Sequence, residues 1–251
     1  MEHDPARTAK VPAVTLTFWV LKILATTLGE TAGDTLSMTL DLGYLAATAI
    51  FAAVFAGAVA GQIAAARFRP WIYWATIIAT TTVGTTLADF ATRSLGIGYA
   101  GGSSLLLVLL LASLAIWYRT LGTVSVESVS TPRAEVFYWV TIMFSQTLGT
   151  ALGDWTADTA GLGYGGAAVV FGGLLALIAA AYFWTRVSRT ALFWAAFVLT
   201  RPLGAVLGDL LDKPVASGGL AFSRPLASAV LLAAMAVGLV AIPQRPAGRS
   251  H

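Results

Sequence analysis

Carboxylate side chains recur at equivalent positions in four apolar segments of this sequence, and polar residues precede them at a spacing of four. Residues four apart lie on one face of an α-helix, so each carboxylate belongs to a polar stripe along one helix. Carboxylate, hydroxyl and amide oxygens are hard ligands that favour Mg²⁺, Ca²⁺, Mn²⁺ or protons over soft metals. The stripes therefore predict an oxygen-lined cation site within a group of helices. They are Thr26/Glu30/Asp34, Thr81/Thr85/Asp89, Gln146/Thr150/Asp154 and Arg201/Ala205/Asp209.

Each residue of the predicted site has an expected role. Arg201 breaks the symmetry of the set and is expected to tune the charge of the site or to gate it. No resident cofactor is predicted, because a divalent cation or a proton would be the transported species. The predicted cation ligands are Glu30, Asp34, Asp89, Asp154 and Asp209, and the predicted pathway-lining residues are Thr26, Thr81, Thr85, Gln146, Thr150 and Arg201.

A structural interpretation of the same residues stays open. An Asp near a helix end can belong to the polar membrane interface, and Arg201 can be the counter-ion of a buried ion-pair network. Against the first possibility, Glu30 lies one helical turn deeper than Asp34, and charges inside a membrane usually mark a pathway or a paired site. Lys22 is expected to extend to the cytoplasmic interface instead.

The stripes belong to a fourfold repeat. An aromatic pair precedes each stripe, a pair of small residues spaced by four lies beside it, and a glycine follows it. Four gapless matches of this pattern indicate tandem repeats. Small residues let helices approach closely in a bilayer, so this ridge is expected to face the bundle interior. The aromatic pairs are Phe18-Trp19, Tyr73-Trp74, Tyr138-Trp139 and Phe193-Trp194; the small pairs are Gly29/Gly33, Gly84/Ala88, Gly149/Gly153 and Gly204/Gly208; the later glycines are Gly43, Gly98, Gly163 and Gly218.

The composition is that of a membrane protein. Of 251 residues, 57% are hydrophobic and 11% are charged, whereas about a quarter are charged in soluble domains. Each repeat contains two apolar segments long enough to cross a bilayer. We therefore expect an all-α fold, a polytopic membrane bundle of eight transmembrane helices built from four parallel two-helix repeats in one membrane domain. The segments are about 12–38 and 44–66, 70–94 and 103–118, 134–158 and 167–185, and 190–211 and 224–243, within repeats of about 12–67, 70–119, 133–188 and 190–243.

The distribution of Lys and Arg predicts the orientation. The loops on one side contain only Arg93, Lys213 and Arg224, and the other side is much more basic. Positively charged loops stay in the cytoplasm, so both termini are expected there. The net charge of +3 reflects this bias rather than nucleic-acid binding. The basic side carries Arg7, Lys10, Arg67, Arg69, Arg119, Arg133, Arg186, Arg189, Arg245 and Arg249, and the tryptophans expected to anchor the same interface are Trp19, Trp71, Trp74, Trp117, Trp139, Trp184 and Trp194.

Four tandem repeats, each with two spans, a tryptophan, a Gly-x₃-Gly-like pair and an Asp, resemble a family of bacterial membrane proteins defined by this repeat and described as of unknown function. The resemblance covers nearly the whole chain. It implies an eight-helix bacterial membrane protein and supplies no activity.

Transport of a small cation or other small solute through a central polar pathway is the function that the residues favour, with the lipid bilayer as the other partner. The alternative is a non-transporting sensor or assembly protein whose polar interior holds helices together. No enzyme activity is expected: the Gly-Asp pairs resemble the Gly-x-Gly-Asp motif of intramembrane aspartyl proteases, but Ala151 and Thr31 occupy its first glycine position. A potassium-filter-like sequence at Gly96–Tyr99 lacks room for a pore helix. Without Cys, no disulfide or thiolate metal site is possible, and His3 and His251 lie in polar tails.

Overall fold

The computed structural model describes residues 9–248, which form eight α-helices and no β-strand within that range. The α-helices are α1 (Leu16–Asp34), α2 (Gly43–Ala64), α3 (Pro70–Asp89), α4 (Gly98–Leu121), α5 (Pro132–Asp154), α6 (Gly163–Trp184), α7 (Arg189–Asp212) and α8 (Arg224–Ala241). A π-helical turn extends each of α1, α3 and α5, at Thr35–Thr39, Phe90–Ser94 and Trp155–Thr159. The expected all-α fold is confirmed. His3, Arg7, Arg249 and His251 lie outside the described residues.

The glycine that follows each stripe lies in a tight turn, as the repeat predicts. Gly43, Gly98, Gly163 and Gly218 all have positive φ angles, between 65° and 85°. This region of backbone conformation is open to glycine at little cost. The first three of these glycines begin the even-numbered helix of their repeat. The reversal between the two helices of a repeat therefore depends on the same residue type in each copy.

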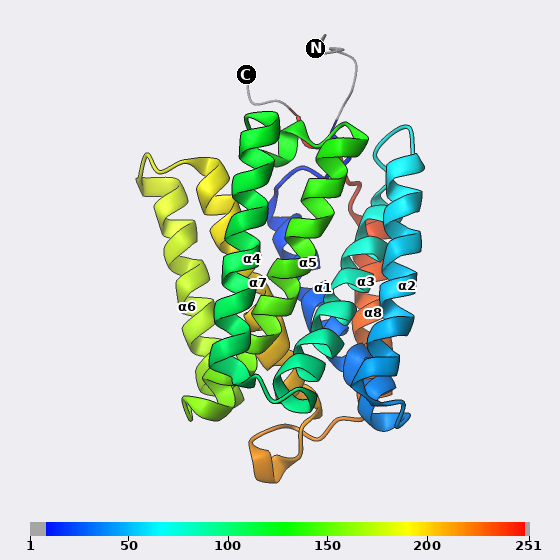
Figure 1. Ribbon diagram of the computed structural model, residues 1–251, viewed down its shortest axis with the longest axis vertical. Helices are drawn as coiled ribbons and strands as arrows, with labels where there is room; N and C mark the ends of the chain where they lie inside the picture. The colour runs from blue at the N-terminus through cyan, green and yellow to red at the C-terminus, as the bar shows by residue number, and fades with distance from the viewer. Residues whose placement is uncertain (1–8, 249–251) are drawn as a thin grey trace.

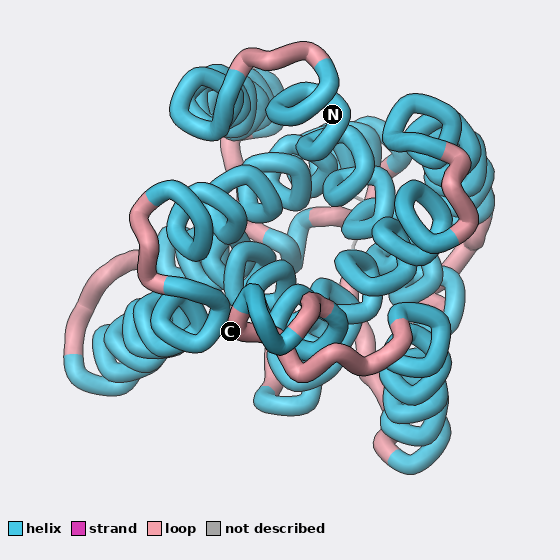
Figure 2. The backbone as a smooth tube through the Cα atoms, turned by 90° about the horizontal axis from the view of Figure 1, so that it is seen from below, coloured by secondary structure: helices cyan, strands magenta, loops and turns pink. Residues whose placement is uncertain are grey.

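The four odd-numbered helices form a ring around a central axis, in the order α1, α3, α5, α7 and back to α1. Figure 2 shows the helix bundle from the end, with the helices seen nearly along their axes. Each even-numbered helix packs outside this ring, against the odd-numbered helix of the following repeat (Figure 1). Thus α2 packs on α3, α4 on α5 and α6 on α7, and α8 closes the circle by packing on α1. The repeats are therefore interlocked, and the first and last repeats are neighbours.

The outer helices identify a membrane protein. Five helices, α2, α4, α6, α7 and α8, are long and apolar enough to span a bilayer, with mean hydropathy from 1.5 to 2.1. In the four outer ones, only 6–17% of the apolar window is buried within the protein. Such an apolar surface is rare on soluble monomers and suits a lipid environment. In α1, α3 and α5, the polar stripe lowers the hydropathy.

Each seam of the ring joins the small-residue ridge of one odd helix to the polar stripe of the next. A Cβ atom at Gly84 would lie 2.9 Å from the backbone carbonyl carbon of Gln146. At Gly29, Gly149 and Gly204, it would overlap the side chains of Thr81, Arg201 and Thr26, which are the equivalent positions of the following helix around the ring. The expected role of the ridge in close packing is confirmed. It brings the four polar stripes together on the axis.

Gly84→Leu is expected to lower the free energy of unfolding by about 1–3 kcal/mol or more, because overpacking forces α3 and α5 apart. Thermal unfolding in detergent measures the change. Gly57→Leu is the control, since Gly57 lies on the outer face of α2 with no atom within 4 Å of the added Cβ. Equal melting temperatures of the two variants would contradict this packing assignment.

The aromatic pairs form a buried layer across one end of the ring. Each Trp packs against the first aromatic residue of the preceding odd helix. The ring centroids lie 5.7 Å apart for Trp74 and Phe18, 5.6 Å for Trp139 and Tyr73, 6.2 Å for Trp194 and Tyr138, and 5.8 Å for Trp19 and Phe193. The hydroxyl groups of Tyr73 and Tyr138 are hydrogen-bonded at 2.6 Å. We call this set the aromatic layer.

The expectation that the repeat tryptophans anchor the protein at the membrane interface is wrong for most of them. Trp74, Trp139 and Trp194 are buried, and so is Trp117 on α4. The physical reason is that these rings fill the space between odd helices, where apolar burial is worth more than an interfacial position. Trp71 and Trp184 are exposed, as the belt requires.

The N- and C-terminal segments meet at the same end as the aromatic layer. The Ala13 amide donates to the Arg245 carbonyl and the Ala247 amide donates to the Val11 carbonyl, both at 2.8 Å. The Lys10 Nζ atom lies 2.7 Å from Glu135 Oε1 on α5. We call this the terminal end and the opposite one the acidic end.

Candidate functional site

The ring axis is lined by equivalent residues at intervals of four, in successive layers below the aromatic layer. No residue of these layers is more than 3% exposed. All eleven residues of the predicted site are among them, so the polar stripes do face the interior. The layers, starting at the terminal end, are Lys22/Ile77/Ile142/Phe197, Thr26/Thr81/Gln146/Arg201, Glu30/Thr85/Thr150/Ala205 and Asp34/Asp89/Asp154/Asp209.

Arg201 occupies the centre of the ring and joins all four odd helices. Its Nη2 atom lies 2.8 Å from Glu30 Oε2, 2.6 Å from Thr85 Oγ1 and 2.5 Å from Thr150 Oγ1, so its two N–H groups are shared among three acceptors. Its Nη1 atom donates to the Thr26 carbonyl at 3.4 Å. The guanidinium group thus fills the axis between the aromatic layer and the acidic end. The close approach of Arg201 to Gly149 makes this position possible.

Lys22 does not extend to an interface, and that expectation is wrong. Its side chain is fully buried, with the Nζ atom 4.2 Å from the centroid of the Phe197 ring. This Nζ atom has no hydrogen-bond partner within residues 9–248. Lys22 lies on the axial face of α1, and the aromatic layer covers it toward the terminal end. The axis therefore holds two basic groups, Lys22 and Arg201, on the terminal side of Glu30.

The four Asp residues of the last layer are each paired with a basic residue. Arg93 lies 2.8 Å from Asp89 and 3.2 Å from Asp154. Lys213 lies 2.7 Å from Asp34 and 2.9 Å from Asp209. Arg224 approaches Asp34 at 3.6 Å and the neighbouring Asp212 at 3.3 Å.

Sequence reasoning missed Arg93, Lys213, Arg224 and Asp212 as members of this layer. A signal was present, because the three basic residues are the only Lys or Arg in the loops at the acidic end. In the sequence, their small number was used only to predict the orientation in the membrane. Their positions in the structure show that they also neutralise the carboxylates.

The predicted single cluster of five carboxylates is divided in two. One carboxylate oxygen each from Glu30, Asp34 and Asp209 lies within 4.8 Å of the others, which is close enough to share a cation. We call these three residues the carboxylate triad. Asp89 and Asp154 are not part of it and are held by Arg93. The division arises because Arg93 stands between α3 and α5, whereas Lys213 stands between α1 and α7.

Lys213 follows the last residue of α7, and its surroundings keep it charged. Burial lowers the pKa of Lys213, but the negative charges of Asp209, Asp34 and Asp212 outweigh burial and hold the pKa well above its usual value. Its ammonium group is a compact, strongly hydrated cation on a flexible stem. Two members of the triad, Asp34 and Asp209, therefore bind a cation that belongs to the protein itself.

Comparison with known proteins identifies the repeat. The family described as Repeat of Unknown Function (DUF347) matches residues 17–68, 72–123, 137–188 and 192–242. The chain belongs to this family. Each matched segment contains most of one odd helix of the ring and all of the even helix that follows it. No curated protein and no solved structure matches the chain. The resemblance expected from the sequence is confirmed, and the family description assigns no activity to the axis.

Proposed function

We propose that this protein transports a small cation across the bacterial inner membrane, as a transporter rather than an enzyme. In this proposal all eight helices cross the bilayer, the terminal end faces the cytoplasm and the acidic end faces outward. The observation that carries the proposal is the position of the Lys213 ammonium, 2.7 Å from Asp34 and 2.9 Å from Asp209. A site that holds a tethered cation in this way can exchange it for a free one.

The charges along the axis suggest how passage is controlled. A cation at the triad meets Arg201 and then Lys22 on its way to the terminal end. Two unit charges 4 Å apart repel each other by about 4 kcal/mol at the effective dielectric constant of a protein. The aromatic layer closes the axis beyond Lys22. Transport therefore requires Arg201 to leave the axis, and the described arrangement is a closed one.

Replacing Lys213 tests the proposal. Lys213→Met removes the competing ammonium, so the affinity of the purified protein for a divalent cation should rise about tenfold or more. Binding of Mn²⁺, followed by electron paramagnetic resonance, measures it. Lys213→Arg keeps the charge and serves as the control. The proposed cation site would be refuted if wild type and Lys213→Met both bound Mn²⁺, Ca²⁺ and Mg²⁺ no more tightly than the Asp34→Asn variant does.

A second candidate is a non-transporting membrane protein, such as a sensor or an assembly factor. One observation favours it: each of the five predicted carboxylate ligands already has a basic partner in the chain. In that case the ion pairs hold the helices together. Lys213→Met would then lower the melting temperature without creating cation binding, because Asp34 and Asp209 would repel each other without compensation.

A further inference from the structure

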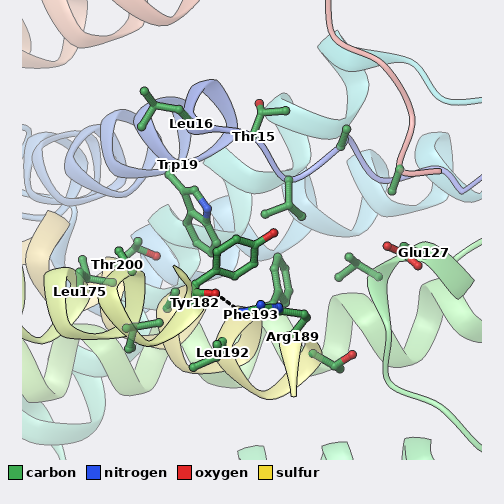
Figure 3. Close-up of a pocket in the computed structure, with 18 of the residues that line it drawn as sticks. Thr15, Leu16, Trp19, Glu127, Leu175, Tyr182, Arg189, Leu192, Phe193 and Thr200 are labelled. Atoms are coloured by element: carbon green, nitrogen blue, oxygen red, sulfur yellow. Dashed lines mark hydrogen bonds between the residues drawn. The ribbon is translucent and has the colours of Figure 1, made fainter. Parts of the chain in front are cut away.

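A groove of about 630 Å³ lies between α1, α6 and α7 at the terminal end (Figure 3). Its volume falls within the range of pockets that bind small molecules. Apolar side chains from all three helices form its walls, including Trp19, Tyr182 and Phe193, which lie together in the middle of the close-up. The groove lies outside the axial site, in the outer wall of the bundle.

The surroundings of the groove indicate contact with lipid. Leu16 on its α1 side is 80% exposed and Phe183 on its α6 side is 75% exposed. Large apolar side chains at this exposure suit the hydrocarbon of a bilayer, and water in an apolar groove between them is unfavourable. An acyl chain that enters from the side removes this surface from water.

Among the described residues that line the groove, one basic side chain, Arg189, stands at its mouth. The Arg189 guanidinium lies 4.2 Å from the centroid of the Tyr182 ring, and its Nη1 atom donates to the Tyr182 carbonyl (Figure 3). An arginine has five N–H donors and binds phosphate through two of them at once. Glu127 also lines the groove, near the C-terminal segment. The phosphate position is therefore at Arg189.

We propose that this groove is a binding site for an anionic phospholipid, with an acyl chain between α1 and α6 and the phosphate on Arg189. The proposal depends on the membrane location of the chain and not on ion transport. Basic pockets between helices at the cytoplasmic side of a membrane hold anionic head groups in this way.

Occupancy of the groove acts on the ring through the seam between α1 and α7. Trp19 and Phe193 belong to the aromatic layer, and Thr200 on the lining accepts a hydrogen bond at its carbonyl from Thr26 Oγ1 at 3.2 Å. A ligand that binds the folded protein alone stabilises it by mass action. A bound lipid is therefore expected to raise the melting temperature by several degrees.

Native mass spectrometry of the full chain, released from vesicles of phosphatidylcholine and phosphatidylglycerol at 3:1, tests the site. One phosphatidylglycerol molecule is expected to stay bound to wild type. Ala179→Trp fills the groove from an exposed lining position and should abolish this binding, whereas Ala176→Trp, on the same helix outside the groove, should not. Arg189→Gln should weaken it at least fivefold, and Arg119→Gln on α4 should leave it unchanged.

Any of three results would overturn the proposal. The first is equal retention of phosphatidylglycerol by wild type and Ala179→Trp, which would place the lipid elsewhere. The second is equal retention of phosphatidylcholine and phosphatidylglycerol with no effect of Arg189→Gln, which would remove the phosphate contact. Dissociation of a dimer by Ala179→Trp, with no bound lipid, would assign the groove to a second copy of the chain instead. None of these outcomes bears on cation binding by Lys213→Met.

Discussion

Arg201→Gln is expected to lower the free energy of unfolding by about 3–5 kcal/mol, the cost of removing one partner from a buried ion pair. The Arg201 side chain is fully buried, and Glu30, its one carboxylate partner within residues 9–248, is 3% exposed. Without the guanidinium, Glu30 keeps a buried charge, and the hydroxyls of Thr85 and Thr150 lose the group that joins them across the axis. Chemical or thermal unfolding in detergent measures the loss.

The double variant Arg201→Gln/Glu30→Gln separates the ion pair from simple packing. Removing both charges leaves no uncompensated carboxylate, so the double variant should recover part of the stability lost by Arg201→Gln alone. Thr150→Val, which removes one hydroxyl acceptor and keeps the shape, should cost about 1 kcal/mol. Strictly additive losses for Arg201→Gln and Glu30→Gln would show that Arg201 acts by filling space and not by its charge.

Much of the interior could be predicted from the sequence because it follows from helical periodicity. Positions four apart share a face whatever the neighbouring helices are. The four stripes and the four small-residue ridges therefore predict which residues of α1, α3, α5 and α7 face inward. The contact between a ridge of one repeat and a stripe of the next, as between Gly84 and Gln146, is a finding of the structure and not of the sequence.

The predicted positions of Lys22 and the repeat tryptophans are wrong because a local sequence pattern does not show whether a residue is covered by neighbouring helices. A Trp at the end of an apolar segment is equally consistent with a membrane interface and with a buried layer between helices. Only the closure of the ring shows that Trp74 and Trp139 cover the axis. Once they do, Lys22 has no route to water, and the snorkelling expected of an isolated helix is blocked.

The pairing of the carboxylates could not be predicted because it depends on which helices are neighbours. Asp34 and Lys213 are 179 residues apart and meet only because α7 packs against α1. Nothing in a linear sequence of repeats indicates that the last copy closes onto the first. The same closure sets Asp34 and Asp209 apart from Asp89 and Asp154, so the four equivalent Asp residues have two different environments.

The different environments of Asp34 and Asp154 lead to the second prediction with a large expected effect. If the triad is the cation site, Asp34→Asn should reduce affinity for Mn²⁺ by roughly ten- to a hundredfold or more. Replacing a residue that only hydrogen-bonds to a metal ligand already has an effect of that size, and Asp34 would be a ligand itself. Asp154→Asn, which lies outside the triad and pairs with Arg93, should have a much smaller effect. Both substitutions are nearly isosteric, and both remove one partner of an interhelical ion pair.

Comparing Asp34→Asn with Asp154→Asn separates the effect of a carboxylate's position in the triad from the effect of losing one negative charge. Binding to both variants is measured in the Lys213→Met background, where the tethered cation is absent, and uptake of the same ion into proteoliposomes is followed in parallel. Melting temperatures show that each variant is folded. Equal loss of affinity in Asp34→Asn and Asp154→Asn would mean that the acidic end attracts cations only through its summed charge. In that case the triad is not a coordination site, and the ion pairs made by Lys213 and Arg93 are structural contacts between neighbouring helices.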